Sequence, residues 1–254
     1  MATQALNPVG LKAAAPFLME QDYAAYTPDE HAVWSELVTR RMPQLEAHAS
    51  EVYLDGFHQI GLKANALPEL SSVSARLEPR TGWNSTPVSG FLPSDAFFEM
   101  LGARKFPTTT WIRSREQMGY ISEPDIFHDV FGHVPMHAHP VFADFLQHYG
   151  QVCAALTNPQ DLERMGRIFW FTVEFGVIRE KGQIKVYGSG LISSHGECTQ
   201  VIERANGLEI RDFDVKQVMD TAVDVSRMQP VLYGIESYEQ IYEATKQAES
   251  LLRS

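Results

Sequence analysis

The sequence predicts a mainly helical α+β fold with a few short strands. Apolar residues recur at helical spacing over most of the chain, and only short runs have the alternating pattern of a strand. The chain has 254 residues of which 44% are hydrophobic, which is enough for one large buried core. We therefore expect a single domain over residues 27–254, preceded by a poorly ordered segment over residues 1–26.

The front third is predicted to be helical. Thr27 is suited to cap a helix over residues 27–42, with Pro28 at its first position and acidic residues in its first turn. Apolar residues at helical spacing predict a second helix over residues 43–61. A short helix and a connection are expected over residues 67–79.

The middle of the chain, residues 81–122, is rich in Gly, Pro and Ser and is predicted to be irregular. It contains one helical stretch that Ser94 or Asp95 could cap, and one strand-like run, TTTWIR, over residues 108–113. A long loop-rich segment inside a compact domain usually has a function.

Helical patterns return in the rear third. They predict helices over residues 139–156 and 158–180, and a final helix over residues 237–254. Between them, residues 182–197 predict a short strand followed by a glycine turn, and residues 208–214 another strand.

Charge and composition exclude several classes of partner. The net charge is −11, with 21 Lys and Arg against 32 Asp and Glu, so the chain lacks the cationic surface that nucleic acids or anionic membranes require. No cationic leader opens the chain, and no stretch reaches the ~18 apolar residues of a membrane span. We expect a cytoplasmic protein in which Cys153 and Cys198 are free thiols that serve as packing residues.

Two histidines five residues apart form the first candidate site. In a continuous α-helix the side chains of His128 and His133 would point about 140° apart. Gly132 is typical of a helix end, and Pro135 disfavours helical geometry just before it. The pattern therefore predicts a helix that stops near Phe131, so that His133 turns back towards His128.

A carboxylate in apolar surroundings is the best candidate for a third ligand. Glu174 lies in the segment IFWFTVEFGV, where an ionised side chain on a helix in the core would be unstable by several kcal/mol unless paired or bound to metal. Two histidines and one carboxylate that leave the opposite face of the metal open form the ligand set of non-haem iron oxygenases. Structural zinc instead prefers four protein ligands that leave no position open.

Simpler explanations remain open from the residues alone. His128 and His133 could be core or helix-end histidines, and Glu174 could pair with Arg167 or Arg179. Taken together with the helix break and the apolar surroundings of Glu174, the pattern favours the metal site over these explanations. Two further histidines, His137 and His139, are expected to lie in a surface loop.

Three longer motifs resemble the pterin-dependent aromatic amino acid hydroxylases. They are EPDIFHDVFGHVP (123–135), FWFTVEFG (169–176) and YGSGLISSHGE (187–197). The stretches TGWNSTPVSGFLPSDAFFEMLG and MQPVLYGIES also occur, in the same order along the chain as in the family, so the resemblance covers nearly the whole chain. It implies the catalytic fold of that family, Fe(II), tetrahydrobiopterin or a related reduced pterin, and dioxygen as co-substrate.

The resemblance also assigns roles to single residues. It implies that the iron ligands are His128, His133 and Glu174, and that the pterin contacts Gly90, Leu92, Phe97 and Asp129. The ring of Phe97 would stack on the pterin. Asp129 stands where the animal enzymes usually have Glu, and Phe169 and Ile121 replace a Tyr and a Thr.

The remaining implied residues concern the amino acid substrate. Arg113 would bind its carboxylate with Asp125 as the orienting partner, Ser193 would orient a ligand histidine, and the aromatic pocket would be lined by Trp170, Phe175 and Val225. Tryptophan hydroxylases usually have Phe in place of Trp170, and tyrosine hydroxylases Asp in place of Val225, so L-phenylalanine is the expected substrate. The alternatives are the same chemistry on tryptophan or tyrosine, or a catalytically silent relative that binds an amino acid.

Rival enzyme classes fit the sequence less well. A zinc hydrolase would need an H-E-x-x-H motif, and a 2-oxoglutarate oxygenase uses H-x-D on a β-rich fold. The chain is too short for the regulatory domain and the tetramerisation coiled coil of the animal hydroxylases, so a monomer is expected. A pterin-4a-carbinolamine dehydratase is the expected pathway partner.

Overall fold

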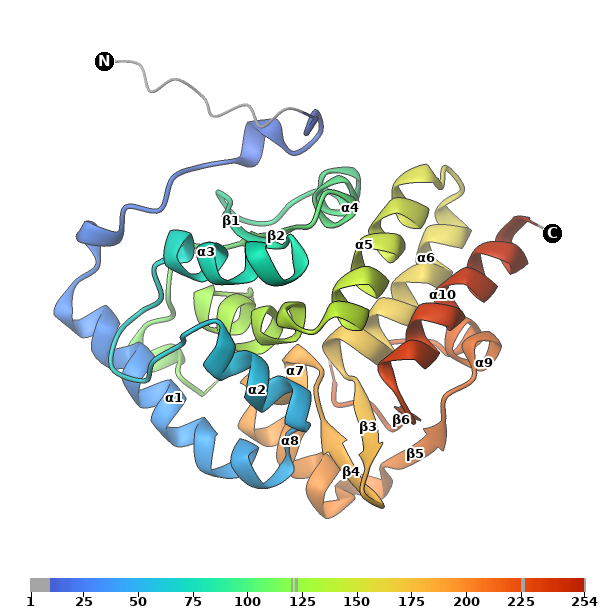
Figure 1. Cartoon of the computed structure of the whole chain (residues 1–254). Coiled ribbons are helices and arrows are strands. Elements are labelled where there is room, and N and C mark those ends of the chain that lie inside the picture. Colours follow the sequence, from blue (N-terminus) through green and yellow to red (C-terminus); the bar gives the residue numbers. More distant parts are fainter. Residues whose placement is uncertain (1–9, 120, 122, 225–226, 254) are drawn as a thin grey trace.

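The computed structural model describes residues 10–253 apart from Tyr120, Ser122, Val225 and Ser226. Helices dominate the described residues and the strands are short, as the sequence predicts (Figure 1). The helices are α1 (Pro28–His48), α2 (Glu51–Gln59), α3 (Leu70–Thr81), α4 (Ser94–Gly102), α5 (Pro140–Ala155), α6 (Pro159–Phe169), α7 (Ser189–Ser193), α8 (His195–Glu203), α9 (Val215–Asp220) and α10 (Tyr238–Arg253). The strands are β1 (Asn84–Pro87), β2 (Lys105–Thr108), β3 (Val177–Glu180), β4 (Gln183–Val186), β5 (Glu209–Asp212) and β6 (Val231–Ile235).

The first helix begins as predicted but ends later. The Thr27 hydroxyl accepts from the Glu30 N–H at 3.2 Å, and the Glu30 carboxylate accepts from the Thr27 N–H at 2.7 Å. The predicted boundary at Pro43 is wrong, because α1 continues through this proline to His48. Pro43 removes one backbone donor, and the helix still buries its apolar face on both sides of that position. The break comes instead before α2, where the Ser50 hydroxyl accepts from the Tyr53 N–H.

A small parallel pair of strands flanks α4. Strands β1 and β2 pair in parallel with Ser85 opposite Phe106, and α4 forms the crossover between them. The strand predicted over residues 108–113 is wrong in position, since β2 ends at Thr108. Beyond it, the backbone N–H groups of Thr109 and Arg113 bond to carboxylates rather than to a neighbouring strand.

The second sheet has the order β4-β3-β6-β5, with β3 antiparallel to β4 and parallel to β6. The prediction of a continuous helix over residues 158–180 is wrong. Helix α6 ends at Phe169, and the chain forms the extended strand β3 from Val177. Gly176 makes this change of direction possible. A Cβ atom there would lie 2.1 Å from the Thr172 carbonyl oxygen and 2.2 Å from the Tyr187 ring, so no larger residue fits.

One hydrophobic core joins the front and rear of the chain. It extends from Val33 in α1 to Ala248 in α10, and α5 packs against both α4 and α10 (Figure 1). Cys153 and Cys198 are buried free thiols within it, as predicted. A smaller cluster, including Leu11, Val88 and Met100, packs the described start of the chain against α4.

The segment before α1 lies partly outside the described residues. Its described part contains two short 3-10 turns, Ala15–Phe17 and Tyr23–Ala25, and the Glu99 carboxylate accepts the N–H groups of Lys12 and Ala14. Poor order over residues 1–26 as a whole stays a prediction.

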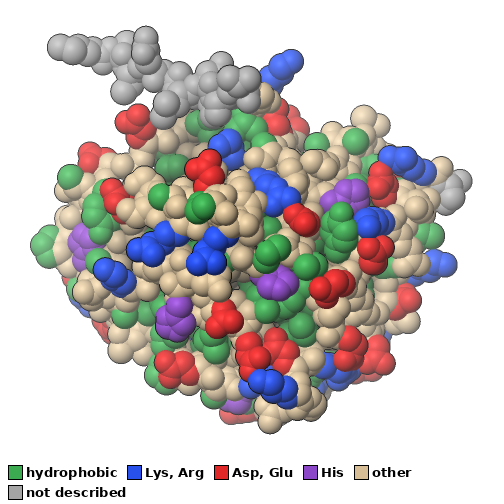
Figure 2. All heavy atoms as spheres, viewed as in Figure 1, with side chains coloured by type: hydrophobic (Ala, Val, Ile, Leu, Met, Phe, Trp, Pro, Cys, Tyr) green, Lys and Arg blue, Asp and Glu red, His purple; other side chains and the backbone are tan. Residues whose placement is uncertain are grey.

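Acidic and basic side chains are interspersed on the face seen in Figure 2, without a continuous cationic area. Within the residues that the structure describes, no helix combines the length and the apolar character needed to cross a membrane.

Candidate active site

His128 and His133 lie on a wide helical turn. Residues Phe127–His133 form a π-helix, in which hydrogen bonds close over five residues, so that side chains five apart come to lie on one side. The two Nε2 atoms are 3.2 Å apart. The expected helix end near Phe131 is therefore wrong, although the predicted convergence of the two rings is correct. Gly132 does not end the helix; a Cβ atom there would lie 3.1 Å from Ser189.

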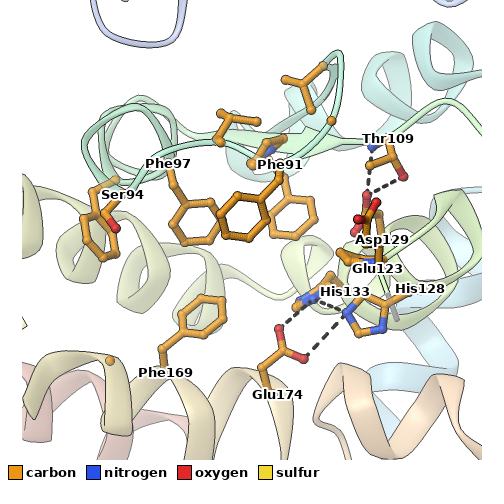
Figure 3. A pocket seen from close by; sticks show the side chains of 18 of the residues that line it. Phe91, Ser94, Phe97, Thr109, Glu123, His128, Asp129, His133, Phe169 and Glu174 are labelled. Atoms are coloured by element: carbon orange, nitrogen blue, oxygen red, sulfur yellow. Dashed lines mark hydrogen bonds and ion pairs between the residues drawn. The ribbon is translucent and has the colours of Figure 1, made fainter. Parts of the chain in front are cut away.

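Glu174 comes from a second wide turn, residues Trp170–Glu174, which directly follows α6. Its Oε1 lies 3.1 Å from Nε2 of His133, and its Oε2 lies 3.6 Å from Nε2 of His128. The three side chains form the group of potential metal ligands among the described residues (Figure 3). The alternative partners of Glu174 are engaged elsewhere: Arg167 pairs with Glu163, and Arg179 with Asp212 and Glu236.

The three donor atoms fit a metal ion. Bonds of about 2.1 Å at right angles place neighbouring donors roughly 3 Å apart, close to the observed separations. Burial acts to raise the pKa of Glu174, but the neighbouring His133 and His128, together with the Ser189 hydroxyl, lower it to about 2. Burial lowers the pKa of His128 to about 4. The carboxylate is thus ionised and the His128 ring neutral at pH 7, the protonation states that metal coordination requires.

Two serines of α7 fix the orientation of the potential ligands Glu174 and His128. The Ser189 hydroxyl donates to Oε2 of Glu174 at 2.7 Å, and the Ser193 hydroxyl donates to the Ser189 carbonyl at 2.8 Å. Nδ1 of His128 is 3.0 Å from the Ser193 oxygen. Because the single hydrogen of that hydroxyl is already used, Nδ1 of His128 must be the donor. This tautomer leaves the Nε2 lone pair of His128 facing His133 and Glu174.

Asp125 and Arg113 form a buried ion pair beside this turn. Asp125 is fully buried and accepts from the backbone N–H, Nε and Nη2 of Arg113 at 3.0, 2.8 and 2.8 Å. It also accepts the His128 N–H at 3.0 Å, so it holds the start of the wide turn. The third guanidinium nitrogen of Arg113, Nη1, lies outside the pair with Asp125.

A cavity of about 350 Å³ opens in front of the potential ligands. In Figure 3, Phe91 and Phe97 lie on one side of it, Phe169 and Glu174 on the other, and the two histidines at one end. Its lining includes the three potential metal ligands and all four residues implied for the pterin, Gly90, Leu92, Phe97 and Asp129. The loop before α4 turns at Gly90, whose φ of 140° favours glycine.

Asp129 presents a carboxyl group to this cavity. Its Oδ2 accepts from the N–H and the hydroxyl of Thr109, both at 2.8 Å. Burial raises the pKa of Asp129 to about 6, although the two bonds from Thr109 oppose the shift. Such a group can accept a hydrogen bond from an N–H of a flat heterocycle in the cavity.

The residues implied for the substrate are placed less closely together. The rings of Trp170 and Phe175 contact each other with centroids 4.8 Å apart, but neither these two nor Arg113 belongs to the lining of the described cavity. Val225 lies outside the described residues. The substrate pocket therefore stays a prediction.

The sequence reasoning missed some contacts and misplaced one histidine. Ser189 and Thr109 were not singled out, although a serine beside glycines in YGSGLISS and a threonine next to a strand were visible signals. His137 is not in a surface loop but fully buried, and stacks on Trp83 with centroids 4.7 Å apart. His139 is half-buried and its Nδ1 accepts from the Phe142 N–H at the start of α5. Both histidines follow the wide turn directly, and the chain stays inside the core there.

Comparison with known proteins agrees with this geometry. The sequence profile described as "Biopterin-dependent aromatic amino acid hydroxylase" matches residues 19–253. The phenylalanine-4-hydroxylase of Vibrio cholerae is 40% identical over 228 residues, covering 89% of this chain and 78% of that protein. The phenylalanine-4-hydroxylase of Ralstonia nicotianae is 37% identical over 230 residues, covering 91% of this chain and 73% of that protein.

Solved structures are similar over the same region. Chromobacterium violaceum phenylalanine hydroxylase with bound iron(III) and 7,8-dihydrobiopterin superposes with a TM-score of 0.87 at 33% identity, covering 93% of this chain and 86% of that one. The iron- and phenylalanine-bound structure of the same enzyme has a TM-score of 0.86 at 32% identity, covering 94% and 88% of the two chains.

Proposed function

The chain belongs to the biopterin-dependent aromatic amino acid hydroxylases, and from this premise we propose that it converts L-phenylalanine to L-tyrosine with dioxygen. The enzyme uses Fe(II) and tetrahydrobiopterin or a related reduced pterin. The observation that carries the proposal is the set of two imidazoles and one carboxylate that converge at the end of a cavity. When bound, the ferrous ion and the reduced pterin activate dioxygen and supply the electrons for its reduction.

In this proposal the iron is held by His128, His133 and Glu174. These three donors would hold the ion from one side, and the cavity lies on the other side of the donor atoms. Ser193 keeps the His128 ring in the tautomer whose Nε2 can bind metal, and Ser189 holds the Glu174 carboxylate. The chain thus contributes a fixed open site.

The cavity wall is proposed to bind the pterin. Phe97 packs edge-to-face against Phe98 and Phe169, which fixes its ring as a flat surface for stacking. Gly90 and Leu92 line the same wall, and Asp129 offers a hydrogen-bond acceptor at its end.

The amino acid is proposed to bind through its carboxylate and its ring. Arg113 is held by Asp125, which supports its assignment to the substrate carboxylate. Trp170, Phe175 and Val225 are assigned to the pocket for the aromatic ring, which favours phenylalanine over tryptophan or tyrosine. Holding the ring carbon and the metal in a fixed relation is the main contribution of these residues to the rate.

The test is a product analysis. Protein loaded with ferrous iron is given a reduced tetrahydropterin in air with L-phenylalanine, L-tyrosine or L-tryptophan, and hydroxylated products are quantified by chromatography against an iron-free sample. We expect tyrosine to form from L-phenylalanine only in the presence of iron, and faster than any product forms from the other two amino acids. Preferred hydroxylation of tryptophan would overturn the substrate assignment, and bound iron without any product would favour a silent amino-acid-binding protein.

Glu174→Gln should abolish product formation and weaken iron binding, because a neutral amide is a poor metal ligand. Glu163→Gln is the matched control, since Glu163 lies on α6 with its side chain 67% exposed and pairs only with Arg167 among the described ion pairs. Full activity of the Glu174 variant would refute the role of this residue.

We further propose that the protein is a cytoplasmic monomer, that residues 27–254 form one catalytic domain, and that a pterin-4a-carbinolamine dehydratase acts beside it in the pathway. The single core from Val33 to Ala248 supports the one-domain assignment. Analytical ultracentrifugation tests the monomer, and a sedimentation coefficient of a dimer or tetramer would contradict it.

A further inference from the structure

A buried arginine lies on the far side of the helix that orients the metal ligands. Arg41, in α1, is only 3% exposed although it carries a full positive charge. Among the described ion pairs none joins Arg41 to a carboxylate. A buried cation without an anionic partner is unfavourable unless hydrogen-bond acceptors compensate its charge. The burial of Arg41 therefore needs an explanation in terms of the groups that it contacts.

The compensating groups belong mostly to α7. Nε of Arg41 donates to the Ile192 carbonyl at 2.8 Å and Nη2 to the Leu191 carbonyl at 3.2 Å, while Nη1 bonds to the Gln44 side chain. Leu191 and Ile192 lie in the last turn of α7, where carbonyl groups lack donors within the helix. A guanidinium at this end satisfies them and opposes the negative end of the helix dipole.

A helix of this length needs such an anchor. Residues Ser189–Ser193 form little more than one turn, and isolated helices this short are not stable in water. Yet the two hydroxyl groups of this turn bond to Glu174 and His128, so small shifts of α7 change the positions of both ligands. The position of α7 relative to α1 is therefore relevant to the metal site.

We propose that Arg41 is a positioning residue for the iron centre, acting through α7. Its planar guanidinium holds two carbonyl groups of α7 at once, and so fixes Ser189 against Glu174 and Ser193 against His128. The inference rests on the proposed function only in that these residues bind a metal ion. A lysine could not reproduce the arrangement, because its ammonium group is a point donor rather than a planar fork.

The test is metal affinity in the absence of turnover. Co(II) is titrated into the metal-free protein, and its dissociation constant and visible d–d spectrum are measured for the wild type, Arg41→Met, Arg41→Lys and Arg40→Met. Arg40 is the matched control because it is the neighbouring arginine on α1, is 65% exposed and pairs with Glu36. All measurements are made well below the unfolding temperature of each variant, checked by circular dichroism.

We expect Arg41→Met to bind Co(II) about 10-fold more weakly with altered d–d bands, in the range typical of residues that orient metal ligands, and Arg40→Met to be unchanged. If Arg41→Met does not fold, Arg41→Lys decides, with weaker affinity and an altered spectrum expected. Wild-type affinity and spectrum in a folded Arg41 variant would overturn the proposal. Failure of the wild type itself to bind Co(II) or Fe(II) would instead refute the metal site, and with it the proposed function.

Discussion

The ion pair between Asp125 and Arg113 makes a quantitative prediction about stability. Asp125 is fully buried and accepts four N–H donors, three from Arg113 and one from His128. The Arg113 side chain is only 8% exposed. Replacing Asp125 by Leu removes the carboxylate and leaves the guanidinium buried without its counter-ion.

The expected loss follows from that burial. Removing one partner of a buried ion pair costs about 3–5 kcal/mol, because the remaining charge cannot return to water. For a domain of this size each kcal/mol lowers the melting temperature by about 2–4 °C, so the variant should melt roughly 6–20 °C below the wild type. The control Asp220→Asn breaks a pair with Arg164 in which Asp220 is 68% exposed, and should change the free energy of unfolding by less than about 1 kcal/mol.

The assay is thermal unfolding and urea unfolding of the metal-free protein, each monitored by tryptophan fluorescence. The double variant Arg113→Leu/Asp125→Leu provides the sharper test, because it removes both charges while the His128 N–H loses its acceptor in both variants. We expect the double variant to be more stable than Asp125→Leu alone. If the single variant behaves like Asp220→Asn, or if removing Arg113 as well brings no recovery, the argument from a buried unpaired charge is refuted.

Three further predictions concern packing, pH and metal. Gly176→Ala should destabilise the fold by about 1–3 kcal/mol or more, since its Cβ would lie 2.1 Å from a carbonyl oxygen, whereas Gly166→Ala, with nothing within 4 Å, should be neutral or stabilising in thermal unfolding. Burial holds the pKa of His137 well below its usual value, so below about pH 6.5 the unfolded chain binds a proton that the folded chain does not, and the free energy of unfolding falls as the pH drops. In urea unfolding, His137→Phe should therefore lose less stability between pH 7 and pH 5 than the wild type. Equal losses in the two proteins would contradict this. Ferrous iron at a hundredfold excess over its Kd should raise the unfolding free energy of the wild type by about 2.7 kcal/mol, and a similar rise in Glu174→Gln would argue against this ligand.

The sequence by itself was sufficient for features set by local chemistry. The capping box of Thr27 and Glu30 fixes the start of α1 because both groups are within four residues. Glu174 could be selected because an ionisable group among large apolar residues needs a partner wherever it is buried. The family motifs selected the same three candidate ligands, His128, His133 and Glu174, without any knowledge of their spacing in three dimensions.

The tertiary structure decided how the candidate ligands meet. Apolar periodicity does not distinguish a π-helical turn from an α-helical one, because the wider turn depends on what packs around it. Gly132 was interpreted as a helix end, but its role is to let α7 approach, which only the folded chain reveals. For the same reason nothing in the sequence links Arg41 to Ile192, since 151 residues separate them and only folding brings them into contact.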